Sequence, residues 1–103
     1  MKKCVKPVDV SKITLFKDYE SGFFGLRYIM SWRVRVSFND FDKKEYRLPH
    51  VLCGHISDKR RDPDTNQLRV TYEFRDSMFG NGSFCASRFR QKMLAQINEQ
   101  KVK

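Results

Sequence analysis

The sequence contains no long apolar run. No segment approaches the ~20 consecutive apolar residues that a membrane-spanning helix needs, and the first ten residues, MKKCVKPVDV, lack the apolar core of a secretory signal. Cysteine is also scarce. Cys4, Cys53 and Cys85 are odd in number and share no repeated spacing, so we do not expect the disulfide framework of an exported protein. Reduced thiols and a cytoplasmic location are the simpler interpretation.

Acidic residues are few relative to basic ones. The 103-residue chain has 21 Lys and Arg against 12 Asp and Glu, which gives a formal net charge of +9. Such a charge favours polyanionic partners, namely nucleic acid, an anionic membrane surface or an acidic protein. Hydrophobic residues make up 40% of the chain and aromatic residues 14%. This composition excludes a wholly disordered chain and is sufficient for one modest core.

Alternation of apolar and polar residues predicts an antiparallel sheet. The strongest pattern is LRYIMSWRVRVSF over residues 26–38, where every second residue from Trp32 to Phe38 is apolar. Residues 12–19 and 68–74 show shorter strand patterns.

Three segments between these strands are harder to assign. Residues 45–56 are strand-like, but Pro49 cannot donate a ladder hydrogen bond and places the segment at an edge or breaks it. Residues 39–44 have turn composition and are expected to close a hairpin, whereas residues 57–67 are expected to form a charged loop.

One helix follows the strands. Apolar residues recur every four positions from Cys85 to Ile97, which predicts an amphipathic helix over residues 84–100 with Ser83 as its cap. A single helix covers one face of a sheet. The expected fold class is therefore α+β, with an antiparallel sheet of three to four strands and one C-terminal helix packed on one face.

The domain organisation expected from these patterns is simple. Residues 1–11 form a flexible basic arm, residues 12–100 form a single α+β domain, and residues 101–103 form a tail. Within the domain, residues 39–67 are a possible inserted strand and loop.

The sheet face opposite the helix should be exposed and rich in arginine. It is expected to carry Arg33, Arg35, Arg47 and Arg69, with the acids Glu45 and Glu73. Even if both acids pair with arginines across the strands, two acids cannot neutralise four arginines. The planar guanidinium group matches phosphate oxygens and the O6/N7 edge of guanine, and a twisted sheet can lie in the DNA major groove. The exposed face therefore indicates nucleic-acid binding.

Three segments resemble a known family when taken in order: SGFFGLRY, WRVRVSF and YEFRDSMFGNGSFCASRFRQKML. The chain resembles the APETALA2-type (ethylene-response-factor-like) DNA-binding domain, in the form found in bacterial and phage proteins. The matching positions are Gly25, Trp32, Arg33, Val34, Arg35, Val36, Phe74, Asp76, Ser77, Phe79, Gly80 and Arg90. The resemblance covers about residues 21–97 discontinuously. Asn81 stands where the family has a second Gly, and residues 39–67 exceed the length of the family's hairpin.

The resemblance implies a non-enzymatic protein that binds double-stranded DNA with the outer face of its sheet. Arg33, Arg35 and Arg69 are expected to reach base edges or phosphates. The residues expected to hold the DNA backbone are Arg27, Lys43, Lys44, Arg60 and Arg61. The position of Trp32 stays open, because the alternation places it with the core whereas a bend near Ser31 would expose it. The interpretation also requires that residues 39–67 leave the outer face uncovered.

Three other functions fit the same residues. The arginine face could dock on an acidic protein, as in a small inhibitor or adaptor from a mobile element. Single-stranded nucleic acid could stack on Trp32, Tyr28 and Phe24. A small nuclease could use His50 or His55 as a base.

Two further motifs have simple structural interpretations. His50, Cys53 and His55 would not share one strand face, so we expect no metal site, and no cofactor is expected. The GNGS segment at residues 80–83 could bind phosphate at a helix start, but a plain turn is preferred. Three phenylalanines do not fit the strand patterns: Phe23, Phe24 and Phe41. If exposed, they would mark a protein or homodimer contact.

Overall fold

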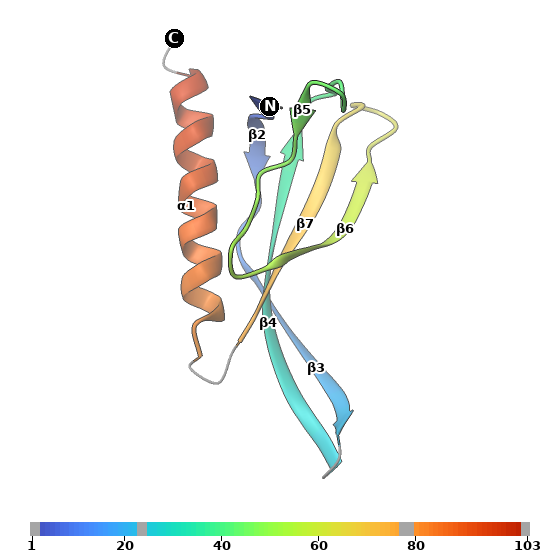
Figure 1. The fold of residues 1–103 in the computed structure, drawn as a ribbon, viewed down its shortest axis with the longest axis vertical. Helices are drawn as coiled ribbons and strands as arrows, with labels where there is room; N and C mark the ends of the chain where they lie inside the picture. The colour runs from blue at the N-terminus through green and yellow to red at the C-terminus, as the bar shows by residue number, and fades with distance from the viewer. Residues whose placement is uncertain (1–2, 23–24, 77–79, 102–103) are drawn as a thin grey trace.

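The computed structural model describes residues 3–22, 25–76 and 80–101, with backbone alone for residues 18–22 and 25–29. It confirms the α+β class: five strands form one antiparallel sheet, two short strands form a second pair, and one C-terminal helix packs on the sheet (Figure 1). The elements are β1 (Lys3–Cys4), β2 (Pro7–Val10), β3 (Thr14–Gly22), β4 (Gly25–Phe38), β5 (Tyr46–Arg47), β6 (His55–Arg61), β7 (Leu68–Arg75) and α1 (Gly82–Lys101).

Strand β4 is the centre of the sheet. Its C-terminal half pairs with β7, which in turn pairs with β6, so that these strands lie in the order β4, β7, β6. β2 and β3 both pair with the other edge of β4, β2 near Phe38 and β3 from Gly25 to Arg33. The pairing with β7 begins at Ser31. The first part of β4 and its partner β3 therefore extend beyond the rest of the sheet as a two-stranded ribbon (Figure 1).

The strand pairing differs from the expected hairpin after residue 38. β4 does not pair with the next strand in sequence; β5 instead pairs in parallel with β1. Residues 55–61, most of which we expected to be loop, form the edge strand β6. An edge strand is exposed and often carries charged residues that prevent further pairing, so SDKRR lacks the apolar alternation that identifies a central strand.

The N-terminal segment is part of the fold and not a flexible arm. Residues 7–10 form β2, which pairs with β4. Val5, Pro7 and Val10 are buried, and β2 also contacts α1. The strand pattern was missed because the segment is short and begins with a proline, which a strand tolerates at an edge or at its first residue.

The core lies between the helix and the inner face of the sheet. The apolar alternation of β4 and β7 is confirmed: Val34, Val36, Phe38, Val70, Tyr72 and Phe74 are at most 1% exposed. The predicted helical stripe supplies the other side of the core, and the Phe89 ring lies 4.5 Å from the Tyr72 ring and 5.6 Å from the Phe74 ring, measured between centroids. Trp32 also packs against this core. It therefore lies on the helix face of the sheet.

The helix begins one residue before the predicted cap. Gly82 is its first residue, and the amide of Gly82 donates a 2.9 Å hydrogen bond to Oδ1 of Asp76. Asp76 supplies the carboxylate that neutralises the helix start. Ser83 lies inside the helix and is not the cap that the sequence predicted. A side chain at Gly82 would meet the Trp32 ring at 2.8 Å, which explains the glycine at this position.

Residues 48–54 cover the helix face of the sheet. The Tyr72 hydroxyl donates a 3.1 Å hydrogen bond to the carbonyl oxygen of Pro49, and a Cβ on Gly54 would lie 2.7 Å from the Phe74 ring. Tyr72 and Phe74 point toward the core, so this segment packs on the core side. Of residues 39–67, β6 widens the sheet and residues 48–54 pack opposite the arginine face. Residues 48–54 therefore leave the outer face of the sheet uncovered.

Candidate nucleic-acid interface

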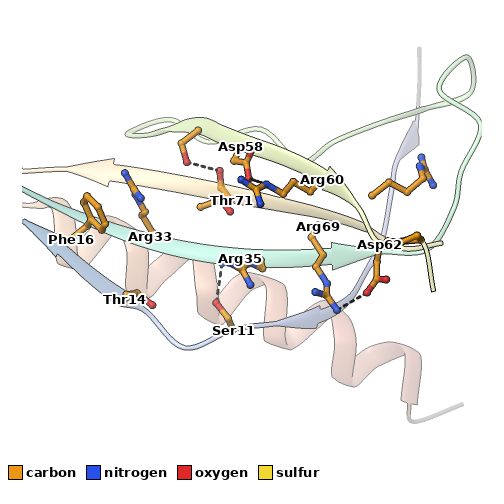
Figure 2. A pocket seen from close by; sticks show the side chains of 13 residues that line it. Ser11, Thr14, Phe16, Arg33, Arg35, Asp58, Arg60, Asp62, Arg69 and Thr71 are labelled. Atoms are coloured by element: carbon orange, nitrogen blue, oxygen red, sulfur yellow. Dashed lines mark hydrogen bonds and ion pairs between the residues drawn. The ribbon is translucent and has the colours of Figure 1, made fainter. Parts of the chain in front are cut away.

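The outer face of the sheet forms a grid of polar side chains. The ladder register aligns Thr14, Arg33, Glu73 and His55 in one row, Arg35, Thr71 and Asp58 in the next, and Ser37, Arg69 and Arg60 in a third. The strand twist makes this face concave, and the hollow has a volume of about 880 Å³. Five arginines line it: Arg33, Arg35, Arg60, Arg61 and Arg69. Figure 2 shows Arg33, Arg35, Arg60 and Arg69 on this face.

Arg33 is held in place on two sides. Its Nε donates a 2.8 Å hydrogen bond to Oε2 of Glu73, and its guanidinium carbon lies 3.8 Å from the centre of the Phe16 ring. The Glu73 side chain is 8% exposed, and its other oxygen lies 3.4 Å from His55 Nε2 and 3.7 Å from Arg75 Nε. Glu73 is thus a nearly buried carboxylate that fixes Arg33 and lies close to His55 and Arg75.

The arginines on β6 and β7 also have acidic partners. Arg60 pairs with Asp58, and Arg69 pairs with Asp62, each at 2.9 Å. The Asp64 amide donates a hydrogen bond to Asp62, and this bond together with the Arg69 guanidinium lowers the pKa of the Asp62 carboxyl. The Arg60–Asp58 pair is exposed, and exposed ion pairs are worth about 0–1 kcal/mol. The Asp62 side chain is more enclosed than Asp58.

Arg61 also lines the hollow. It pairs with Asp40 at 2.9 Å, and its Nη1 also donates to the carbonyl oxygen of Asn66 at 3.1 Å. Glu73 and Glu45 were the acids expected on this face. The aspartates that pair with its arginines lie in segments interpreted as turns and loops, and were therefore not expected there: Asp40, Asp58 and Asp62.

Arg35 differs from its neighbours. Its backbone amide donates to Ser11 Oγ at 3.0 Å and its carbonyl oxygen accepts from the Ser11 amide at 2.8 Å. The carbonyl oxygen of Ser11 in turn accepts from Arg90 Nε at 2.9 Å. The Arg35 guanidinium has no ion pair or hydrogen bond with any residue that the structure describes. Its charge is therefore the unbalanced one within the hollow.

The structure brings together five of the eight predicted site residues. Lys43 and Lys44 lie in the turn before β5 and do not line the hollow. Arg27 pairs with Glu20 along the β3–β4 ribbon, and its side chain lies outside the described residues. Arg47 was expected on the wet face but lies in β5, away from the five-stranded sheet.

Several residues of the hollow were missed by sequence reasoning. Phe16, Thr14, Ser11 and Thr71 all line it. The alternation of residues 12–19 already placed Thr14 opposite the apolar residues, and extending it by two positions would have placed Phe16 on the same face. Ser11 could not be found in this way, because it lies between β2 and β3.

The other candidate motifs have structural roles. At the GNGS segment, where a phosphate site was considered, Asp76 already accepts the Gly82 amide hydrogen, and its negative charge opposes an anion there. Burial and a hydrogen bond with the Cys53 thiol raise the pKa of the Cys85 thiol. In the described part of the chain, no three His, Cys, Asp or Glu side chains come close enough to hold a metal ion. Phe23 and Phe24, which were expected to mark a contact if exposed, lie outside the described residues, and Phe41 packs partly against the core.

Comparison with protein-family models, curated proteins and solved structures found no match for this chain. Within the described ranges, no helix combines the length and the apolar character required to cross a bilayer.

Proposed function

We propose that the protein binds double-stranded DNA through the outer face of its sheet. The observation that supports this most directly is the convergence of five arginines on one concave face, opposite the helix. This function requires that residues 39–67 leave the outer face uncovered, and residues 48–54 of that segment pack on the core side. The resemblance to APETALA2-type domains supports the same surface.

The size of the face suits the major groove. The major groove is about 12 Å wide and admits a two-stranded β-ribbon, and strands lie about 4.8 Å apart. Two neighbouring strands of the face, such as β4 and β7, can therefore lie in the groove. In that position Arg33, Arg35 and Arg69 can contact base edges and phosphates, and Arg60 and Arg61 on the flanking strand β6 can contact the backbone.

Individual residues take different roles in this proposal. Arg35 engages a phosphate first, because no described carboxylate competes for it. Arg33 and Arg69 reach base edges or phosphates, whereas Arg60 and Arg61 exchange their aspartates for the DNA backbone. Outside the hollow, the cationic residues expected to add flanking backbone contacts are Arg27, Lys43 and Lys44. Trp32 takes no part, because it packs against the core.

The test is fluorescence-anisotropy titration of a labelled random duplex, its single strand and the matching RNA over a salt series. Duplex binding should be strongest and should fall steeply with salt. Arg35→Ala should weaken duplex binding and lower the slope of log K against log salt by about 0.9, the value for one phosphate contact. Lys92→Ala is the matched control, because Lys92 is exposed on the helix, on the other side of the sheet. No duplex binding at low salt, or equal losses in both variants, would contradict the proposal.

A second candidate function follows from the mixed charge of the face. Arg33, Arg60, Arg61 and Arg69 are all paired with acids. A surface with both signs of charge is also suited to a protein partner with complementary charges. Such a docking protein would show no DNA affinity in low salt. In both proposals the chain is not an enzyme, and a DNA-binding role corresponds to a cytoplasmic, nucleoid-associated location.

A further inference from the structure

Phe16 is an exposed aromatic residue on an otherwise polar face. It lines the arginine hollow and is 41% exposed. Phe16 pairs with Ser31 in the ladder, one row from Arg33. No part of the sheet's core requires a phenylalanine here, because the core lies on the opposite face.

The Phe16 ring and the Arg33 guanidinium form a preorganised stack. The cation lies 3.8 Å from the ring centre, and the Arg33 Nε is fixed by the 2.8 Å hydrogen bond to Glu73. Glu73 is nearly buried and is itself held by His55 and Arg75. A ligand that binds this stack therefore finds two groups already ordered, which reduces the entropy cost of binding.

We propose that Phe16 and Arg33 bind an unpaired nucleobase of a DNA strand that adjoins the duplex. Aromatic rings and guanidinium planes both stack on nucleobases. Bases inside a duplex are stacked on their neighbours, so a base that reaches this site must be unstacked, as in an overhang. The inference rests on the proposed duplex binding and adds a feature of the DNA that the site recognises.

The position of the stack supports this assignment. Phe16 and Arg33 lie at one end of the hollow, whereas Arg69 and Asp62 lie toward the other end (Figure 2). Arg35 is two residues along β4 from Arg33, a rise of about 6.6 Å. The unpaired Arg35 guanidinium is thus near enough to hold a phosphate of the strand whose base stacks on Arg33 and Phe16.

The experiment compares three labelled duplexes: one blunt, one with a three-nucleotide 5′ overhang and one with a three-nucleotide 3′ overhang. Stacking is worth about 1–3 kcal/mol per base, so one overhang duplex should bind about 5- to 150-fold tighter than the blunt duplex. Phe16→Leu should remove this preference, so that the blunt and overhang duplexes bind this variant with equal affinity. The matched control is Leu15→Ala, an exposed neighbour on the opposite face, which should keep the preference.

A second readout detects the stacking itself. A 2-aminopurine base in the overhang should lose fluorescence on binding to the unmodified protein and to Leu15→Ala, but not to Phe16→Leu. Circular dichroism verifies that both variants are folded. Equal binding of the blunt and overhang duplexes by the unmodified protein would overturn this inference and leave the duplex proposal standing. Failure to bind any of the three duplexes would overturn the duplex proposal as well.

Discussion

Replacing Arg33 and replacing Arg35 should have different effects on stability, although both arginines lie on the same face of β4. Arg33 hydrogen-bonds the nearly buried carboxylate of Glu73 and stacks on Phe16. The Arg35 guanidinium has no such contact among the described residues. Arg33→Ala should therefore destabilise the fold, whereas Arg35→Ala should affect DNA binding and leave stability within about 0.5 kcal/mol.

The magnitude for Arg33→Ala follows from its two contacts. A partly exposed ion pair with good geometry contributes about 1 kcal/mol at the upper end of its range, and a cation–π contact at an exposed site contributes about 0.5–1 kcal/mol. His55 and Arg75 stay close to Glu73 and limit the cost of the orphaned carboxylate. We expect a loss of about 1–2 kcal/mol, equivalent to a fall in Tm of roughly 4–16 °C for a domain of this size.

Urea unfolding monitored by circular dichroism measures both variants. Glu73→Gln and the double variant complete a cycle that isolates the coupling between Arg33 and Glu73. The coupling should be about 1 kcal/mol, since the ion pair supplies most of it. Equal stabilities of Arg33→Ala and Arg35→Ala, or a coupling near zero, would refute the assignment of Arg33 as a side chain fixed by Glu73.

Three further predictions concern the packing beneath this face. Gly54→Ala should destabilise the protein by about 1–3 kcal/mol in urea unfolding, because a Cβ would lie 2.6 Å from a backbone oxygen and 2.7 Å from the Phe74 ring; unchanged stability would contradict the tight packing of this segment. Tyr72→Phe should cost about 1 kcal/mol near neutral pH, since it removes the hydrogen bond to Pro49. Burial raises the pKa of Tyr72 above its usual value of 10.0, so the unmodified protein should lose stability as pH rises through about 10 and the Phe variant should lose less; parallel alkaline profiles would contradict this. Asp76→Ala should lower stability by about 0.5–2 kcal/mol by freeing the first helical amide, and Asp76→Asn should recover part of it; no effect of Asp76→Ala would exclude Asp76 as the cap.

The strand alternation in the sequence predicted the core and the arginine face of β4 and β7. Residues such as Val34 and Tyr72 pack inward, and Arg35 and Arg69 point outward, because the two faces of a strand alternate strictly with residue number. The four-residue spacing of Phe89 and its neighbours likewise predicted the helix and its buried face.

The partners of each strand could not be predicted in the same way. Local patterns do not record which strand pairs with which. We therefore expected a hairpin closed by residues 39–44, whereas β4 pairs with β7. The edge strand β6 carries Asp58 and Arg60 without an apolar alternation, and was interpreted as loop. The acids that balance the arginines were missed for the same reason, since their proximity depends on that long-range pairing.

The placement of β4 also has a consequence for synthesis of the chain. Residue 38 ends β4, but β7 and the helix that cover its apolar face extend to residues 75 and 101. At about 5–20 residues per second, the roughly 60 residues from there to the last buried helical position, Ile97, take about 3–12 s to be made. During that interval Val34, Val36 and Phe38 are shielded by neither β7 nor α1. Burial of the core thus waits for the last quarter of the chain, and a ribosome that stalls before the helix releases a β-rich, aggregation-prone fragment.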